Sequence, residues 1–251
     1  MTNPPEQKEA LFHFYGELND FLAPWQRNQP IPLTFRGAQT VKHLFESLGV
    51  PHTEVGRLYA GRREVDFSYQ VAQGDEMHIY PYALPLDLPN SVWLSRNEPA
   101  GFVLDNHLGR LAAYLRMLGF DSVYRSDIQD DELAEVAERE ERILLTRDHR
   151  LLMRNSIHYG YWVRSKLPRQ QLGEILRRWN LPPLCRPFRR CIRCNGLLQT
   201  VEKEQILHRL QPLTRLYFEE FRICPDCQQV YWKGSHYERM QTMIAALKVQ
   251  S

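Results

Sequence analysis

Residues 11–82 alternate short apolar stretches with polar turns, and their apolar positions follow two different periods. "LFHFYGEL" and "IPLTFRG" alternate with the period of two that is typical of half-buried strands. "TVKHLFESLGV" instead spaces its apolar residues as a helix does, between an N-cap at Thr40 and a stop at Gly49. Two short strands flank a predicted turn at Gly61, and "GDEMHIYPY" is the last strand of a small mixed unit.

Residues 101–184 alternate strand-like and helix-like stretches. Strands are predicted in "GFVLD", "DSVYRS", "RILLT" and "YGYWVRS". "LGRLAAYLRMLG" and "DDELAEVAERE" have helical spacing, and "PRQQLGEILRRWN" is a further amphipathic helix. Strands separated by helices of this length predict an α/β domain, with a parallel sheet covered by helices.

Two remaining stretches differ from these patterns. Proline recurs in residues 83–100, and because proline removes backbone donors, we expect a linker or an extended arm there. Residues 185–251 contain all five cysteines and end in a predicted helix, "HYERMQTMIAALKV". The pattern therefore predicts three domains, at 11–82, 101–184 and 185–251.

Composition narrows the class of protein. The chain has 251 residues, of which 43% are hydrophobic and 25% charged, as is typical of soluble globular proteins. No apolar run approaches the roughly 20 residues that a membrane span needs, and the N-terminus lacks the pattern of a secretory signal. We therefore expect a cytoplasmic protein without a membrane partner.

The charge is small overall but uneven. The net charge is +2 for the whole chain, yet residues 185–251 contain 11 Lys and Arg against 6 Asp and Glu. An excess of positive charge in one segment indicates an anionic partner such as RNA, or else a solvated basic face.

The strand order in residues 11–82 favours a β-grasp fold, in which two strands, a helix and two strands follow one another. The helix "TVKHLFESLGVP" and the ending "VDFSYQVAQGDEMHIYP" resemble the ubiquitin-like sulfur-carrier proteins. Those proteins act through a C-terminal Gly-Gly, whereas this domain continues into "YALPLDLP". We expect a docking or regulatory module that binds a protein partner, or a structural appendage, and not a sulfur carrier.

Two aspartates follow predicted strands at equivalent positions. Asp105 ends "GFVLD" and Asp148 follows "RILLTR", while Asp127, Asp130 and Asp131 precede the "ELAEVA" helix. In an open α/β sheet, functional groups gather outside the carboxyl ends of the strands. Converging carboxylates need a divalent cation to offset their repulsion, although each Asp is also a common helix N-cap. The pattern therefore leaves a metal site and simple capping open.

The cysteines form a second candidate site. Cys191-x-x-Cys194 and Cys224-x-x-Cys227 are two pairs whose spacing is typical of a structural Cys₄ zinc site. A closed Cys₄ site has no open position, so the predicted zinc stabilises the fold and takes no part in catalysis. Cys185 is left over and is expected to be a packed thiol.

Four stretches carry a resemblance to a known family: "VLDNHLGRLAAYLRMLGFDSVYRSD", "DDELAEVAEREERILLTRDHRLL", "RCIRCNGLL" and "CPDCQQVYWKGSH". They resemble the Mut-seven-C RNase family, in which a PIN-like nuclease domain is followed by a zinc ribbon and often preceded by a ubiquitin-like domain. The resemblance covers about residues 11–245. It implies a ubiquitin-like domain at 11–82, a PIN-like domain at 101–184 and a zinc ribbon at 185–251.

The resemblance also implies the site and the activity. Asp105, the acid in "DDEL" and Asp148 are expected to bind Mg²⁺ or Mn²⁺ for hydrolysis of RNA. Asp130 is the favoured middle acid, because it opens the helix, and Asp131 is the alternative. A fourth acid, frequent in the wider PIN group, has no counterpart after "RDHRLL". That difference favours the alternative function, a non-catalytic RNA- or ribosome-binding protein.

Basic and aromatic side chains near both sites are candidates for RNA contact, since Arg suits phosphate and aromatic rings stack on bases. Each has an alternative role, as a surface charge or ion pair for the basic residues and as ribbon core for the aromatic ones. The candidates are Arg110, Arg147, Arg190, Arg193, Trp232 and Lys233.

Overall fold

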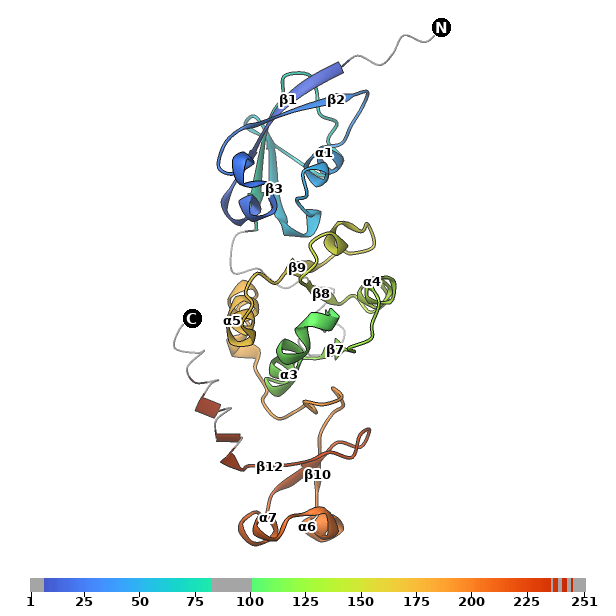
Figure 1. Cartoon of the computed structure of the whole chain (residues 1–251), viewed down its shortest axis with the longest axis vertical. Coiled ribbons are helices and arrows are strands. Elements are labelled where there is room, and N and C mark those ends of the chain that lie inside the picture. The colour runs from blue at the N-terminus through green and yellow to red at the C-terminus, as the bar shows by residue number, and fades with distance from the viewer. Residues whose placement is uncertain (1–6, 83–100, 236, 239–240, 243–244, 246–251) are drawn as a thin grey trace. The chain divides into compact units, whose positions relative to one another are not determined.

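The computed structural model describes residues 7–82, 101–235, 237–238, 241–242 and 245 (Figure 1). The chain forms two compact units. Of the described residues, the first unit combines 7–82 with Asp148–Trp162, and the second combines 101–147 with those from 163 onward. The predicted linker at 83–100 and most of the predicted C-terminal helix lie outside the described residues.

The first unit is built on a five-stranded mixed sheet with the order β2-β1-β5-β3-β4. β1 pairs antiparallel with β2 and parallel with β5, and β3 pairs antiparallel with both β4 and β5. This sheet and the helix α1, with no other α-helix in residues 7–82, confirm the predicted β-grasp fold. The bounds are β1 Gln7–Phe14, β2 Ile31–Arg36, α1 Val41–Ser47, β3 Val55–Ala60, β4 Arg63–Val65 and β5 Glu76–Pro81.

The helix α1 begins and ends as the sequence predicts. The Thr40 side chain accepts a hydrogen bond from the His43 N–H at 3.2 Å, which satisfies one of the unpaired donors of the first turn. Gly49 follows the helix with φ +93°, a conformation that glycine adopts without strain. The apolar side of α1, with Phe45, packs into a core that also contains Phe12 of β1.

The segment Asp148–Trp162 is the other part of the first unit. It contains a short 3₁₀ turn at Leu151–Met153 and the strand β9 at Gly160–Trp162, which was predicted from "YGYWVRS". The segment packs on the short 3₁₀ helix His52–Glu54, which directly precedes β3.

The second unit contains three parallel strands in the order β7-β6-β8. β6 is buried along its whole length, as strands of a parallel sheet usually are. α3 packs on β7 and α5, and α4 packs on β6 and β8, which confirms the predicted parallel α/β fold (Figure 1). The bounds are β6 Phe102–Leu104, α3 Gly109–Met117, β7 Ser122–Tyr124, α4 Asp130–Arg139, β8 Ile143–Thr146 and α5 Pro168–Arg178.

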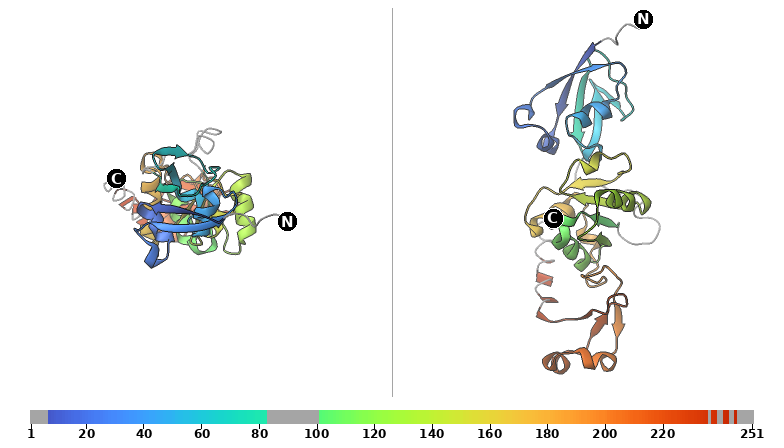
Figure 2. Two further views of the ribbon diagram at one scale, coloured as in Figure 1. Left: turned by 90° about the horizontal axis from the view of Figure 1, so that it is seen from above. Right: turned by 45° about the vertical axis from the view of Figure 1, so that its right-hand side comes forward.

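The C-terminal part of the second unit, drawn in orange to red-brown in Figure 2, is built on an antiparallel sheet. Its three strands have the order β10-β11-β12. Two short helices that the sequence pattern did not predict lie between β10 and β11. A small core of Ile206, Leu210, Phe221 and Val230 holds these elements together. The bounds are β10 Gln199–Val201, α6 Lys203–Ile206, α7 Pro212–Tyr217, β11 Phe221–Ile223 and β12 Val230–Trp232.

Candidate functional site

Asp105 follows β6 directly and is only 6% exposed. Its Oδ1 accepts a hydrogen bond from the His107 N–H at 2.9 Å, so it caps the turn that begins there. Its Oδ2 accepts hydrogen bonds from Thr146 Oγ1 at 2.7 Å and from the Arg147 N–H at 2.5 Å. Asp105 therefore joins the carboxyl ends of β6 and β8. A carboxylate has about four lone-pair sites, so these three bonds leave capacity for a further ligand.

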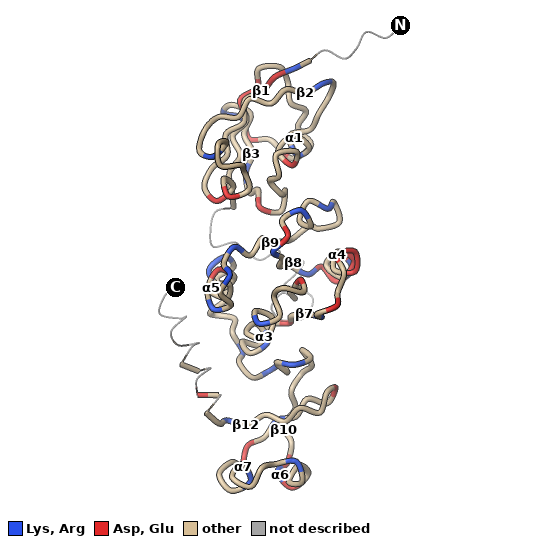
Figure 3. Tube along the Cα trace, in the orientation of Figure 1, with Lys and Arg blue, Asp and Glu red and all other residues tan. Residues whose placement is uncertain are grey.

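The middle acids lie at the start of α4, which appears as a red run in Figure 3. Asp130 and Asp131 are exposed in the first helical turn, where the helix dipole favours negative charge. Asp127 and Glu132 form ion pairs with Arg125, at 3.2 and 2.5 Å. Asp127, Asp130 and Asp131 are thus all exposed to solvent, and Asp127 is also paired with an arginine.

Asp148 is exposed and opens the segment that groups with the first unit. Its Oδ1 accepts a hydrogen bond from the Arg150 N–H at 2.9 Å, which fixes the turn leading into the 3₁₀ helix Leu151–Met153. Asp148 therefore stabilises a local turn, while the N-cap of that helix is Arg150. Among the described residues, Asp105, Asp130 and Asp148 do not form a compact group of potential metal ligands. Their role as a joint metal site stays a prediction.

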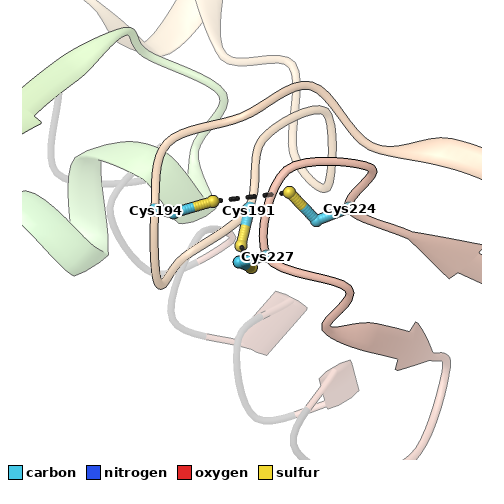
Figure 4. Close-up of side chains that lie close together, drawn as sticks. All are labelled: Cys191, Cys194, Cys224 and Cys227. Carbon is cyan, nitrogen blue, oxygen red and sulfur yellow. Dashed lines mark hydrogen bonds between the residues drawn. The ribbon is translucent and has the colours of Figure 1, made fainter.

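The four predicted zinc cysteines do come together (Figure 4). Their sulfur atoms all lie within 4.8 Å of one another, with Cys191 Sγ 3.5 Å from Cys227 Sγ and Cys194 Sγ 3.4 Å from Cys224 Sγ. In a tetrahedral zinc site with Zn–S distances near 2.3 Å, sulfur atoms lie about 3.8 Å apart. The donor set and its spacing therefore fit a structural zinc ion.

The two cysteine loops have the same backbone design. The Asn195 N–H donates to the Cys191 carbonyl at 2.9 Å, and the Gln228 N–H donates to the Cys224 carbonyl at 2.8 Å. Both donors have positive φ, at +75° and +60°. A Cβ on Gly196 would lie 2.9 Å from the Cys224 sulfur, so glycine allows the two loops to approach.

The thiols differ in acidity. Burial raises the pKa of Cys194 to about 12, and the nearby Cys224 thiol adds to the effect. Burial also opposes ionisation of Cys191, but hydrogen bonds from the Tyr231 hydroxyl and the Cys194 backbone lower its pKa to about 7. Neighbouring thiolates repel one another, so a bound cation is what would allow all four to ionise.

Two charged residues, the buried Arg116 and the half-buried Asp121, fasten the first cysteine loop to the parallel domain. The Arg116 guanidinium donates to the carbonyl oxygens of Ile192 and Arg193 at 3.1 and 2.9 Å. Asp121 pairs with Arg190 at 3.1 Å and accepts a hydrogen bond from Asn195 Nδ2 at 2.8 Å. The parallel domain and the cysteine module are thus parts of one unit.

This junction was not predicted from the sequence. Its position four residues after the buried Ala112, on the apolar face of α3, is a signal that could have indicated burial. Arg142 also contributes, because its guanidinium pairs with Asp121 at 2.8 Å. Burial raises the pKa of Asp121, but Arg142, Asn195 and Arg190 outweigh it and hold the pKa below its ordinary value.

The candidate RNA-contacting residues divide into three groups. Arg190 is buried, and Arg147 donates to the Ser165 carbonyl at 2.6 Å, so both guanidinium groups make structural contacts. Lys233 is exposed but pairs with Glu220. The exposed side chains of Arg110, Arg193 and Trp232 remain accessible to a ligand.

The fold and the sites define a protein with a β-grasp unit, a parallel α/β domain and a four-cysteine module. The family model described as "Mut7-C RNAse domain" matches residues 100–244, and the one described as "Mut7-C ubiquitin" matches residues 7–87. The chain therefore belongs to the Mut7-C RNase family, and the resemblance inferred from the sequence is confirmed. No curated protein and no solved structure matched the chain.

Family membership supports a nuclease, and a nuclease domain suggests that the chain binds nucleic acid. The ubiquitin-like domain suggests interaction with a protein. No helix in the described part of the chain has the length and apolar character needed to cross a membrane.

Proposed function

We propose that the chain is a metal-dependent ribonuclease that hydrolyses phosphodiester bonds at the carboxyl edge of its parallel sheet. The observation that carries the proposal is the buried Asp105 carboxylate, which lies at the end of β6 and accepts two hydrogen bonds from the end of β8. Ligands of open α/β sheets bind outside the carboxyl ends of the strands. Membership of the RNase family supports RNA as the substrate.

The proposed metal ligands are Asp105, Asp130 and Asp148, with Asp131 as the alternative middle acid. Carboxylate oxygens are the ligands that Mg²⁺ and Mn²⁺ prefer. Such an ion would orient the attacking water and stabilise charge on the phosphoryl oxygens.

The other residues of the proposal would bind RNA or stabilise the module that binds it. Arg110, exposed in the first turn of α3, would contact a phosphate, and Arg193 and Trp232 would contact RNA at the cysteine module. The four cysteines would hold zinc, which would stabilise the module that presents these side chains. The ubiquitin-like domain would recruit a protein partner, and we place the protein in the cytoplasm.

The test is cleavage of mixed RNA by the purified full chain in Mn²⁺, beside the Asp105→Asn and Asp148→Asn variants. Each substitution should lower the cleavage rate by more than about 100-fold, because loss of a direct metal ligand costs more than the 10- to 100-fold loss of a group that supports one. Asp130→Asn and Asp131→Asn, measured in parallel, distinguish the two candidates for the middle acid.

Asp127→Asn is the matched control, since Asp127 is an exposed acid of the same region that is paired with Arg125. It should cleave as fast as the unsubstituted protein. Because Asp105 is buried, thermal melting and zinc content must show that Asp105→Asn is folded. Cleavage that survives both Asp105→Asn and Asp148→Asn contradicts the proposal.

A second candidate function is non-catalytic binding of RNA or of a ribosomal surface. The absence of a fourth acid after "RDHRLL" favours it. Under this alternative the protein binds RNA without cleaving it in Mn²⁺. Replacing Arg193 and Trp232 would then weaken binding, while Asp148→Asn would not.

A further inference from the structure

A groove of about 420 Å³ lies on the cysteine module, and none of the four cysteines lines it. The strand register pairs Thr200 with Arg222 and Arg222 with Tyr231, so these three side chains share one face of the β10-β11-β12 sheet. Val230, next to Tyr231, belongs to the small core on the opposite face. The described residues that line the groove all lie between 187 and 237, within the second unit. Its volume is in the range of pockets that bind small ligands.

Aromatic side chains contribute much of the lining, namely Phe188, Tyr231, Trp232 and Tyr237. The rings of Phe188 and Tyr237 stack with their centroids 4.1 Å apart. Phe188 has φ +63°, a conformation that is costly for an aromatic residue, and Arg222 Nη1 donates to its carbonyl oxygen at 2.8 Å. The module thus holds this ring in the groove against a backbone cost. Flat rings of this kind favour a flat aromatic ligand, such as a nucleobase.

The charged part of the lining is acidic on balance, with three glutamates against one arginine and one lysine. Two of the glutamates, Glu219 and Glu220, pair with lysines. Glu202, which directly follows β10, is exposed and has no ion pair among the described residues. A carboxylate repels phosphate but accepts hydrogen bonds from N–H groups. Glu202 therefore suits the edge of a base better than the backbone of RNA.

We propose that this groove binds one unpaired guanine base of RNA, with the Glu202 carboxylate accepting hydrogen bonds from guanine N1–H and the 2-amino group. Unstacked RNA bases are recognised by stacking on aromatic side chains and by hydrogen bonds to their Watson–Crick edges. Guanine has two adjacent donors on that edge, which match the two oxygens of one carboxylate, whereas adenine and uracil have a donor beside an acceptor. The inference rests on the proposed function, in which RNA is the substrate, and adds the base that the cysteine module selects.

The experiment measures binding of end-labelled pentanucleotides to the full chain by fluorescence anisotropy, without added Mg²⁺ or Mn²⁺, so that binding is separated from cleavage. The probes are UUGUU, UUAUU, UUUUU and UUIUU, in which inosine lacks the 2-amino group of guanine. Glu202→Gln and Tyr237→Ala are compared with a matched control, Glu204→Gln. Glu204 is an exposed glutamate of α6 that does not line the groove. The zinc content of each variant shows whether the module is folded.

UUGUU should bind about tenfold more tightly than UUAUU or UUUUU, as a bidentate contact to a base provides, and UUIUU should lie between them. Glu202→Gln should remove the preference for guanine, because its amide has one acceptor oxygen and places a donor against a donor of the base. Tyr237→Ala should weaken all four probes by a similar factor of about five or more, since stacking is tolerant of sequence. Glu204→Gln should bind as the unsubstituted chain does.

Equal binding of the four probes by the unsubstituted chain would overturn the inference, as would a preference for guanine that survives Glu202→Gln. The peptide Gly-Lys-Gly tests the other occupant that an acidic, aromatic groove suits, a cationic side chain of a protein. Binding of this peptide that is lost in Glu202→Gln, without binding of any oligonucleotide, would also overturn it. Failure of the proposed function looks different, because RNA would then bind with a preference for guanine but stay uncleaved in Mn²⁺.

Discussion

Asp105 and Asp148 show how one residue type in equivalent sequence positions can have different surroundings. Asp105 is buried and accepts three hydrogen bonds from two strand ends, whereas Asp148 is exposed and fixes a local turn. Asp105 is the N-cap of the 3₁₀ helix that follows it, the role that the sequence left as an alternative to metal binding, whereas the N-cap after Asp148 is Arg150. Capping and metal binding are compatible in Asp105, because a carboxylate has more lone pairs than its cap requires.

Gly119 supports a residue-scale prediction about the junction inside the second unit. It has φ +95°, and a Cβ there would lie 2.1 Å from the Arg186 carbonyl oxygen. The Arg186 N–H donates to the Leu118 carbonyl at 2.8 Å, so Gly119→Ala would push this contact apart. We expect a destabilisation of more than about 1 kcal/mol, measured by urea unfolding of the second unit.

The control is Gly61→Ala, where φ is +56° but no atom lies within 4 Å of the added Cβ. Gly61→Ala therefore has the cost of placing alanine at a positive φ, but no steric clash of the added Cβ. Equal losses of stability for the two variants would show that the Arg186 contact contributes nothing.

At the scale of elements, the cysteine loops were predictable and the helices between them were not. The Cys-x-x-Cys spacing is a local pattern with a fixed chemical meaning. α6 and α7 are short, and α7 exposes Leu213, Leu216 and Tyr217. A helix of four to six residues has too few turns for a periodic apolar face, so its sequence has no detectable pattern.

Metal removal tests the cysteine module as an element. We expect about one zinc ion per chain. Its removal by a chelator should unfold β10, β11 and β12, because their core contains four buried residues in the part of the chain that the structure describes. Hydrogen exchange over residues 191–232 and the emission of Trp232 would report the change. Cys224→Ser should lose zinc, whereas Cys185→Ser should keep it. If the zinc-free protein showed the same hydrogen exchange over residues 191–232 as the zinc-bound protein, the structural role of zinc would be refuted.

At the scale of the whole molecule, the division into two compact units does not follow the order of the sequence. The segment Asp148–Trp162 interrupts the second unit and folds with the first. The predicted boundaries at 101–184 and 185–251 describe continuous stretches. The parallel domain and the cysteine module share a unit, through contacts of the buried Arg116 and the half-buried Asp121.

Two compact units predict two thermal transitions in calorimetry. Phe12→Ala, in the core of the first unit, should cost about 3–5 kcal/mol and lower one transition. A zinc chelator should lower the other, because the cysteine module belongs to the second unit. A single transition that moves with both treatments would show that the units unfold together.

The sequence by itself determined the elements and the chemistry that is local to them. Strand and helix periods, the Thr40 cap and the cysteine spacing depend on neighbouring residues, so they can be recognised without the fold. The tertiary structure decided which charged side chains are buried and which part of the first unit holds Asp148–Trp162. Those outcomes depend on contacts between residues far apart in the chain, such as Glu54 with Trp162 and Arg190 with Asp121, and no local pattern encodes them.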